Sequence, residues 1–303
     1  MNVCVSGVSG FVGKYLSQFL KDNSIDIQSL SLRDEGWKLE SNSSIVALIH
    51  LAGKAHDTSN TSQPEEYFKV NRDLTIELFN QFINSSIRDF FFFSSVKAVA
   101  DTVDGVLGEE ILASPQTPYG QSKWEAEKYL QEQVLPAGKR LFIIRPCMIH
   151  GPDNKGNLNL LYQVVRKGLP WPLASFHNQR SFLSIDNLCY LIAEMIRKVD
   201  LPSGVYNCAD DETLSTNELV ALIATILGKM PRLWHIPEGV IKASVKIGDF
   251  LPLPLNSERL KKLTESYVVS NAKIKAALGI EKLPLTAKAG LEKTIRSFNE
   301  DKK

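Results

Sequence analysis

The sequence predicts an α/β protein with a doubly wound parallel sheet and a smaller C-terminal α/β domain. Short apolar runs in the first half indicate strands buried on both faces, at residues 3–5, 45–50, 90–93 and 141–144. Helical spacing of apolar residues separates these runs, at residues 12–20, 64–84 and 118–133. Strands that alternate with helices are typical of a parallel sheet covered on both sides.

The second half is less regular than the first. Prolines interrupt it at residues 169–173 and 251–255, where they favour the walls and lids of a pocket. We therefore expect a dinucleotide-binding domain from residues 1–152 with 181–208. Residues 153–180 with 209–303 form the predicted substrate domain.

Composition excludes several classes of partner. The 35 basic and 34 acidic residues are too evenly balanced for an electrostatic grip on nucleic acid or on a membrane. The N-terminus enters a strand pattern without an export leader, and no apolar run has the roughly 18 residues of a membrane span. The spacing of the four cysteines suggests buried thiols and no metal site. We expect a cytoplasmic protein with neither nucleic acid nor membrane as partner.

A glycine-rich turn follows the first strand and opens the first helix. Glycines at positions 7, 10 and 13 permit a tight turn, close approach of a diphosphate and close helix packing. The diphosphate would lie at the helix N-terminus. The pattern indicates a Rossmann-type cofactor site that includes Gly7, Gly10, Phe11, Val12 and Gly13.

The end of the second strand decides between the two nicotinamide cofactors. NAD enzymes usually place a carboxylate there, whereas this sequence has Ser31 and Arg33. A guanidinium pairs well with a ribose 2′-phosphate, which slightly favours NADP(H) over NAD(H). In the alternative interpretation Arg33 lies in solvent and Asp34 binds the ribose.

Three polar residues form a candidate catalytic group. Tyr119 and Lys123 stand four residues apart at a predicted helix start, which places them on one face. A nearby cation favours phenolate, so the pair can provide acid and base chemistry. Ser95 follows the third apolar run, at the sheet edge where ligands bind, and Ser94 is an alternative.

Together with His50-Leu51-Ala52-Gly53 and Arg145-Pro146…Gly151-Pro152, these motifs resemble the extended short-chain dehydrogenase/reductases that modify nucleotide sugars. The resemblance spans most of the chain. It implies a catalytic triad of Ser95, Tyr119 and Lys123, with Lys123 also holding the nicotinamide ribose. It further implies that the cofactor site includes Leu51, Ala52, Gly53, Asn71 and Pro146.

The same resemblance implies a UDP-sugar site in the second half. Asn157 and Leu158 match a segment near the diphosphate or sugar, where Ser95 also contacts the substrate. Arg180 matches a diphosphate-binding arginine, a task that suits the paired donors of a guanidinium. We expect the lone His150 to pack rather than to react.

The resemblance leaves a choice of reactions. Val96 and Lys97 follow Ser95 where dehydratases have an acidic pair, so dehydration is disfavoured. We predict hydride transfer, at carbon 4 of a UDP-hexose, by a UDP-4-keto-sugar reductase. The alternatives are a UDP-glucose or UDP-N-acetylglucosamine 4-epimerase and a non-catalytic NAD(P)-binding sensor or scaffold.

Three further features of the chain bear on that choice. Arg33 favours the reductase, and the absence of an arginine at residues 263–266 disfavours the epimerase. Residues 33–44 leave little room for the family's usual third strand, so we expect an altered adenine pocket. Relatives often pair through helices that correspond to residues 64–84 and 118–133, which predicts a homodimer.

Overall fold

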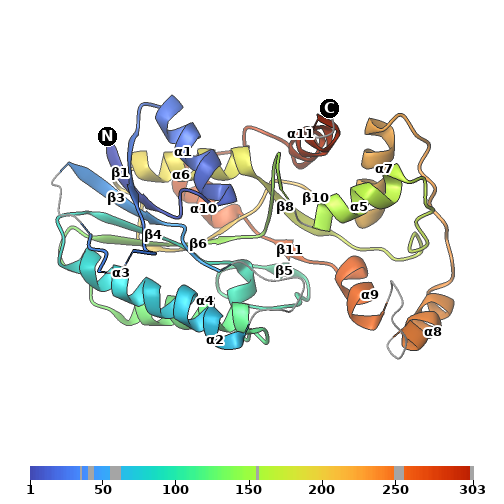
Figure 1. Cartoon of the computed structure of the whole chain (residues 1–303), viewed down its shortest axis with the longest axis horizontal. Helices are drawn as coiled ribbons and strands as arrows, with labels where there is room; N and C mark the ends of the chain where they lie inside the picture. Colours follow the sequence, from blue (N-terminus) through green and yellow to red (C-terminus); the bar gives the residue numbers. More distant parts are fainter. Residues whose placement is uncertain (35, 40–43, 55–62, 155–156, 249–255, 301–303) are drawn as a thin grey trace.

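A parallel six-stranded sheet forms the centre of the molecule (Figure 1). The computed structural model describes residues 1–34, 36–39, 44–54, 63–154, 157–248 and 256–300. The strand order is β2-β1-β3-β4-β6-β9, and every neighbouring pair is parallel. The strands are β1 (Asn2–Ser6), β2 (Asp26–Leu30), β3 (Ile45–His50), β4 (Asp89–Phe93), β6 (Arg140–Pro146) and β9 (Gly204–Cys208). The four predicted strands are confirmed.

Helices cover both faces of this sheet (Figure 1). One face carries α1 (Phe11–Asp22), α6 (Ile185–Arg197) and α10 (Ala272–Leu278). The opposite face carries α2 (Pro64–Tyr67), a π-helical turn η1 (Phe68–Asp73), α3 (Leu74–Ile83) and α4 (Pro118–Glu132). Alternate residues of each strand point to the two faces, so Val3 and Val5 pack in one core cluster and Cys4 in another. The predicted doubly wound fold is confirmed.

The six-stranded sheet ends at β2 on one side. Among the described residues between Leu30 and Ile45 no strand is formed, and β2 is the last strand on that side. This agrees with the expectation that residues 33–44 are too few for a further strand. The adenine end of a cofactor would therefore meet loop residues rather than a strand.

The rest of the chain builds a smaller α/β layer around a second core. Its sheet has the order β10-β8-β7, with β7 (Met148–His150), β8 (Arg180–Ser184) and β10 (Thr213–Leu214). Its helices are α5 (Asn157–Arg166), α7 (Thr216–Ile226), α8 (Glu238–Gly248), α9 (Ser257–Thr264) and α11 (Ala287–Glu300). A short helix η2 (Val96–Ala98) and the pair β5 (Val106–Leu107) and β11 (Val268–Val269) lie between the two parts.

The core clusters follow the predicted division into domains only approximately. Val269, Ile274 and Leu283, which fall in the predicted substrate domain, pack with the core beneath α1 and α6. The boundaries therefore stay a prediction. The four cysteines are buried, as expected from their apolar neighbours.

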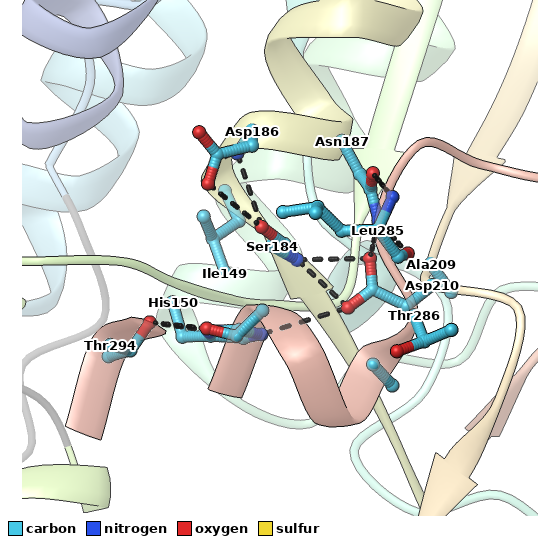
Figure 2. Close-up of polar contacts among 12 residues, drawn as sticks. Ile149, His150, Ser184, Asp186, Asn187, Ala209, Asp210, Leu285, Thr286 and Thr294 are labelled. Atoms are coloured by element: carbon cyan, nitrogen blue, oxygen red, sulfur yellow. Dashed lines mark hydrogen bonds and ion pairs between the residues drawn. The ribbon is translucent and has the colours of Figure 1, made fainter. Parts of the chain in front are cut away.

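A buried polar cluster joins the two layers (Figure 2). Asp210, just after β9, accepts hydrogen bonds from the Ser184 backbone at 3.1 and 3.0 Å and from the Asn187 amide at 2.7 Å. His150 Nδ1 lies 2.9 Å from the Thr294 hydroxyl on α11. The His150 ring meets Phe182 edge-on, with its other nitrogen 3.7 Å from Asp210. His150 is thus a packed residue at a structural joint.

Candidate active site

The glycine turn fits a diphosphate. Gly7 has a φ of 77°, and a Cβ there would lie 2.6 Å from the Ala52 amide nitrogen. A Cβ on Gly13 would lie 2.2 Å from the Gly7 carbonyl oxygen, so α1 packs directly on the turn. Gly10 caps α1 without a side-chain hydrogen bond, and the first turn contains no acid. The N-terminal N–H groups of α1 therefore favour an anion.

The other predicted cofactor residues lie at the same edge of the sheet. Phe11 and Val12 begin α1 and pack against the core cluster between α1 and the sheet. Leu51, Ala52 and Gly53 follow β3, and Pro146 ends β6. Because parallel strands end together, these positions lie along the same carboxyl edge of the sheet as the glycine turn, with Pro146 three strands away from it.

Asn71 fixes this edge from the opposite face. It lies in the π-helical turn, where the sequence predicts a continuous helix; such turns are frequent at functional sites. Its side chain accepts from the Lys54 amide at 2.8 Å and donates to the Lys54 carbonyl and the Ser122 hydroxyl, both at 3.1 Å. Asn71 thereby joins the segment after β3 to α4. Its side chain shapes the site through these two neighbours.

Ser31 and Arg33 are both exposed beyond the end of β2. β2 pairs with β1, so this position lies next to the glycine turn. The last residue of β2 is Leu30, which means that no carboxylate ends the strand. The neighbouring Asp34, the residue of the alternative interpretation, is exposed as well.

The predicted catalytic residues meet where α4 approaches the loop after β4. A Cβ on Gly120 would lie 2.4 Å from the Lys97 carbonyl oxygen, so only glycine permits this approach. A hydrogen bond joins the hydroxyls of Ser95 and Tyr119. Lys123 Nζ donates to the Phe93 carbonyl oxygen at 2.8 Å, and the lysine is only 5% exposed. The structure joins Ser95 to Tyr119 and places Lys123 one helical turn after Tyr119 on α4.

Burial sets the charges of this group. Burial raises the pKa of Tyr119. The hydrogen bond from Ser95 lowers this pKa, and the nearby Tyr67 raises it further. Burial lowers the pKa of Lys123 to about 8, with the Glu127 carboxylate acting in the opposite direction. The phenol is therefore protonated near neutral pH in the free protein, whereas the sequence analysis expected a nearby cation to favour phenolate; burial outweighs that effect.

A buried ion pair between Arg145 and Glu127, which the sequence analysis missed, lies next to Ser94. Arg145 donates to both oxygens of Glu127, at 3.0 and 3.1 Å from Nε and at 2.5 Å from a terminal nitrogen. The Ser94 hydroxyl also donates to Glu127. Ser94 is thus engaged away from Tyr119, which favours Ser95 over its neighbour as the residue at the reacting oxygen. Glu127 stands four residues after Lys123, a spacing that could have revealed it.

Cations gather on the substrate side of the same loop. Arg180 begins β8 and donates to the Lys262 carbonyl oxygen. Burial lowers the pKa of Lys97, and the Arg180 and Lys262 cations lower it further against Asp101 and Glu265. Lys97 stands two residues after Ser95, and its Nζ donates to the Asp101 carbonyl oxygen at 2.7 Å and lies 4.3 Å from the centre of the Tyr267 ring. The sequence analysis identified Arg180 and missed Lys97.

The remaining predicted substrate residues lie at the start of α5. Leu158 is buried in the second core, so only its backbone could face a ligand. Asn157 begins the helix, and its side chain lies outside the described part of the structure.

Comparison with known proteins defines the class. Residues 3–209 match the NAD dependent epimerase/dehydratase family. The chain is similar to a UDP-glucose 4-epimerase of Vibrio cholerae, with 30% identity over 98% of this chain and 95% of the relative. It is also similar to an N-acetyl-α-D-glucosaminyl-diphospho-ditrans,octacis-undecaprenol 4-epimerase of Escherichia coli O157:H7, with 26% identity over 97% and 94% of the two chains. A solved structure of MoeE5 with UDP-glucose and NAD aligns with a TM-score of 0.75 over 99% of both chains at 18% identity, which supports the fold.

The chain belongs to the NAD dependent epimerase/dehydratase family. The predicted class is confirmed: it is an NAD(P)-dependent enzyme of the extended short-chain dehydrogenase/reductase type. No helix in the described residues has the length and apolar character of a membrane span.

Proposed function

We propose that the protein is an NADPH-dependent reductase of a 4-keto sugar carried on UDP. The observation that carries this choice is the end of β2, where Ser31 and Arg33 are exposed and no carboxylate ends the strand. A reductase must exchange its cofactor in every turnover, and this position suits the 2′-phosphate of NADPH. An epimerase regains its cofactor within the cycle.

The residues around the glycine turn fit a nicotinamide cofactor. The N–H groups at the start of α1 would bind its diphosphate, and Lys123 would bind the nicotinamide ribose. When bound, the cofactor supplies a hydride to the carbonyl carbon of the sugar. Gly53 leaves room for Asn71 and Lys123, because a Cβ there would lie 3.0 Å from Asn71 Oδ1 and 3.2 Å from Lys123 Nζ.

Tyr119 is the proposed proton donor to the carbonyl oxygen. Because burial raises its pKa, the phenol holds a proton to give as the oxygen gains negative charge. Ser95 donates a hydrogen bond to the same oxygen, and the Lys123 cation stabilises the phenolate that remains. Solvent then returns the proton to Tyr119.

The diphosphate of the substrate would bind the cations beside the loop after β4. Arg180 supplies paired donors, and Lys97 adds a second charge close to Ser95. This arrangement supports a nucleoside diphosphate sugar with its hexose towards Tyr119. The Asn157–Leu158 segment is the proposed contact on the sugar side.

Purified protein incubated with NADPH or NADH and a small panel of UDP-4-keto-sugars and UDP-hexoses tests this function. We expect oxidation of NADPH, faster than of NADH, with a UDP-4-keto-hexose. Interconversion of UDP-hexoses without net cofactor oxidation would instead establish the second candidate, a 4-epimerase. Similarity to the two 4-epimerases over nearly the whole chain favours that candidate. Cofactor binding without turnover of any substrate would point to a sensor or scaffold.

We also propose an oligomeric state and a cellular compartment for the protein. We propose a homodimer that pairs through α3 and α4, which cover one face of the sheet together with α2. Light scattering of the purified protein checks the mass, and a monomeric mass would contradict pairing. The cytoplasm stays the proposed compartment.

A further inference from the structure

Several large apolar side chains of the smaller layer are exposed. Their segments include α8 and the chain between α7 and α8, at the end of the molecule away from the six-stranded sheet (Figure 1). The exposed fractions are 52% for Leu169, 86% for Met230, 56% for Trp234 and 55% for Val240. Single exposed apolar residues are ordinary, but clusters of them mark interaction sites. These four belong to two segments, residues 166–169 and 229–246, which we call the basic-apolar surface.

Backbone contacts hold the two segments side by side. The Trp171 amide donates to the Arg232 carbonyl and the Trp234 amide to the Trp171 carbonyl, both at 2.8 Å. The Arg232 guanidinium reaches the Gly168 carbonyl at 3.1 Å, and Lys229 Nζ donates to the Arg166 carbonyl. Leu233 packs on the second core while Trp234 points outward. The exposed tryptophan is therefore held on an ordered backbone.

Helix α8 continues the surface. Ile241 and Val245 are buried in the second core, and Val240, Lys242 and Lys246 remain exposed. The helix therefore has one face against the protein and an outer face that mixes apolar and basic side chains. Such a helix is suited to lie in an interface between water and lipid.

The charge of this surface differs from that of the whole chain. Residues 166–169 and 229–246 contain six basic side chains and one acidic one, in a chain of net charge +1. The basic residues are Arg166, Lys167, Lys229, Arg232, Lys242 and Lys246. The acidic one, Glu238, pairs with Lys242 at 2.6 Å. The even composition of the chain conceals this local excess.

We propose that the basic-apolar surface docks the protein on an anionic lipid bilayer. A cluster of lysines and arginines is attracted to anionic headgroups, and tryptophan prefers the headgroup level of a bilayer. The apolar side chains would enter only the boundary of the acyl region, so no spanning helix is needed. The proposal departs from the sequence prediction of no membrane partner, which rested on the total charge.

Docking by this surface is independent of the proposed reaction. The surface lies on the smaller layer, and the glycine turn and α4 belong to the six-stranded sheet and its helices (Figure 1). The experiment therefore measures lipid binding by the full chain without substrate or cofactor. Its outcome does not depend on whether the enzyme is a reductase or an epimerase.

Sedimentation with vesicles of equal parts phosphatidylcholine and phosphatidylglycerol tests the proposal. We expect the protein to bind these vesicles at low salt, to leave them as salt rises, and to ignore vesicles of phosphatidylcholine alone. Lys167→Glu combined with Lys246→Glu should weaken binding at least about tenfold, since both side chains are exposed on the basic-apolar surface and each basic residue near a membrane adds attraction. Trp234→Ser should weaken binding without a change of charge.

Lys21→Glu combined with Lys282→Glu is the matched control, because both lysines are exposed outside the basic-apolar surface. This control should bind like the wild type, and circular dichroism should show every variant folded. Absence of binding to anionic vesicles, or equal loss in the control, would overturn the proposal. So would self-association that Trp234→Ser abolishes in protein that ignores vesicles, because a second copy would then cover the surface.

Discussion

The two sides of the candidate site are held in different ways. On the α4 side, Lys123, Glu127 and Asn71 are buried and engaged with neighbouring groups of the protein. On the phosphate side, Arg33 is exposed beyond β2, whereas Arg180 and Lys97 are half-buried and donate to the Lys262 and Asp101 carbonyl oxygens. The comparison indicates that the fold holds the groups for proton chemistry and the two cations on the substrate side in place, whereas the proposed choice of cofactor depends on an exposed cation, Arg33. Substitutions on the first side should change turnover and those on the second should change binding.

The largest expected effect concerns Tyr119. Tyr119→Phe should lower kcat at least about 100-fold and leave cofactor affinity unchanged, because it removes the proton donor and keeps the ring. Steady-state rates with fluorescence titration of NADPH measure both quantities. Near-normal turnover would end the assignment.

Ser95→Ala is the matched comparison within the site. It should cost less than Tyr119→Phe, because one hydrogen bond to the oxygen is removed while the donor remains. Ser94→Ala should act mainly on stability through Glu127. If Ser94→Ala lowered kcat more than Ser95→Ala, the two serines would exchange roles.

The next effect concerns the substrate diphosphate. Arg180→Ala should weaken UDP binding by about 1.5–3 kcal/mol, the range for hydrogen bonds to a charged partner. Cofactor affinity should hardly change, because the proposed cofactor site is the glycine turn and does not include Arg180. Calorimetry with UDP checks this, and equal affinity in mutant and wild type would place the diphosphate elsewhere.

The buried lysine gives a prediction on stability and pH. Burial lowers the folded-state pKa of Lys123 from 10.5 to about 8, so the unfolded chain binds the proton more tightly. The resulting cost to the folded state is complete below about pH 8 and disappears as pH rises towards 10.5. The free energy of unfolding of Lys123→Met relative to wild type should therefore fall by about 2 kcal/mol between about pH 7 and about pH 9.5.

Urea unfolding of both proteins at the two pH values measures this difference. The contributions of the other lysines cancel in the difference between the two free energies of unfolding, because both proteins contain them. A difference that stays constant with pH would mean that Lys123 titrates normally in the folded protein.

The smallest expected effect concerns the cofactor. Wild type should bind NADPH more tightly than NADH, and Ser31→Asp combined with Arg33→Ser should reverse the preference. The change removes a guanidinium-phosphate contact and adds an acceptor for the ribose hydroxyls, worth at least about tenfold in the affinity ratio. Fluorescence titration of both reduced cofactors decides it. An unchanged ratio would mean that Arg33 points into solvent and would favour an NAD-retaining epimerase.

The sequence predicted what depends on short-range patterns. The parallel strands, the glycine turn and the Tyr119–Lys123 spacing all follow from periodicity or from one turn of helix. The buried contact of Ser94 with Glu127 joins residues 33 apart in the chain, and periodicity carries no information about it. The π-helical turn at Asn71 could not be predicted, because its extra residue leaves the apolar spacing of a continuous helix nearly intact. The basic-apolar surface was hidden because total charge averages over the whole molecule.

Isotope transfer tests the central claim most directly. Protein incubated with NADPH deuterated at the transferring position of its nicotinamide and with a UDP-4-keto-hexose should form NADP+ and UDP-hexose in equal amounts, with one deuterium at carbon 4. Tyr119→Phe should give the same product at least about 100-fold more slowly. UDP-hexose epimers formed without deuterium and without loss of NADPH would contradict net reduction.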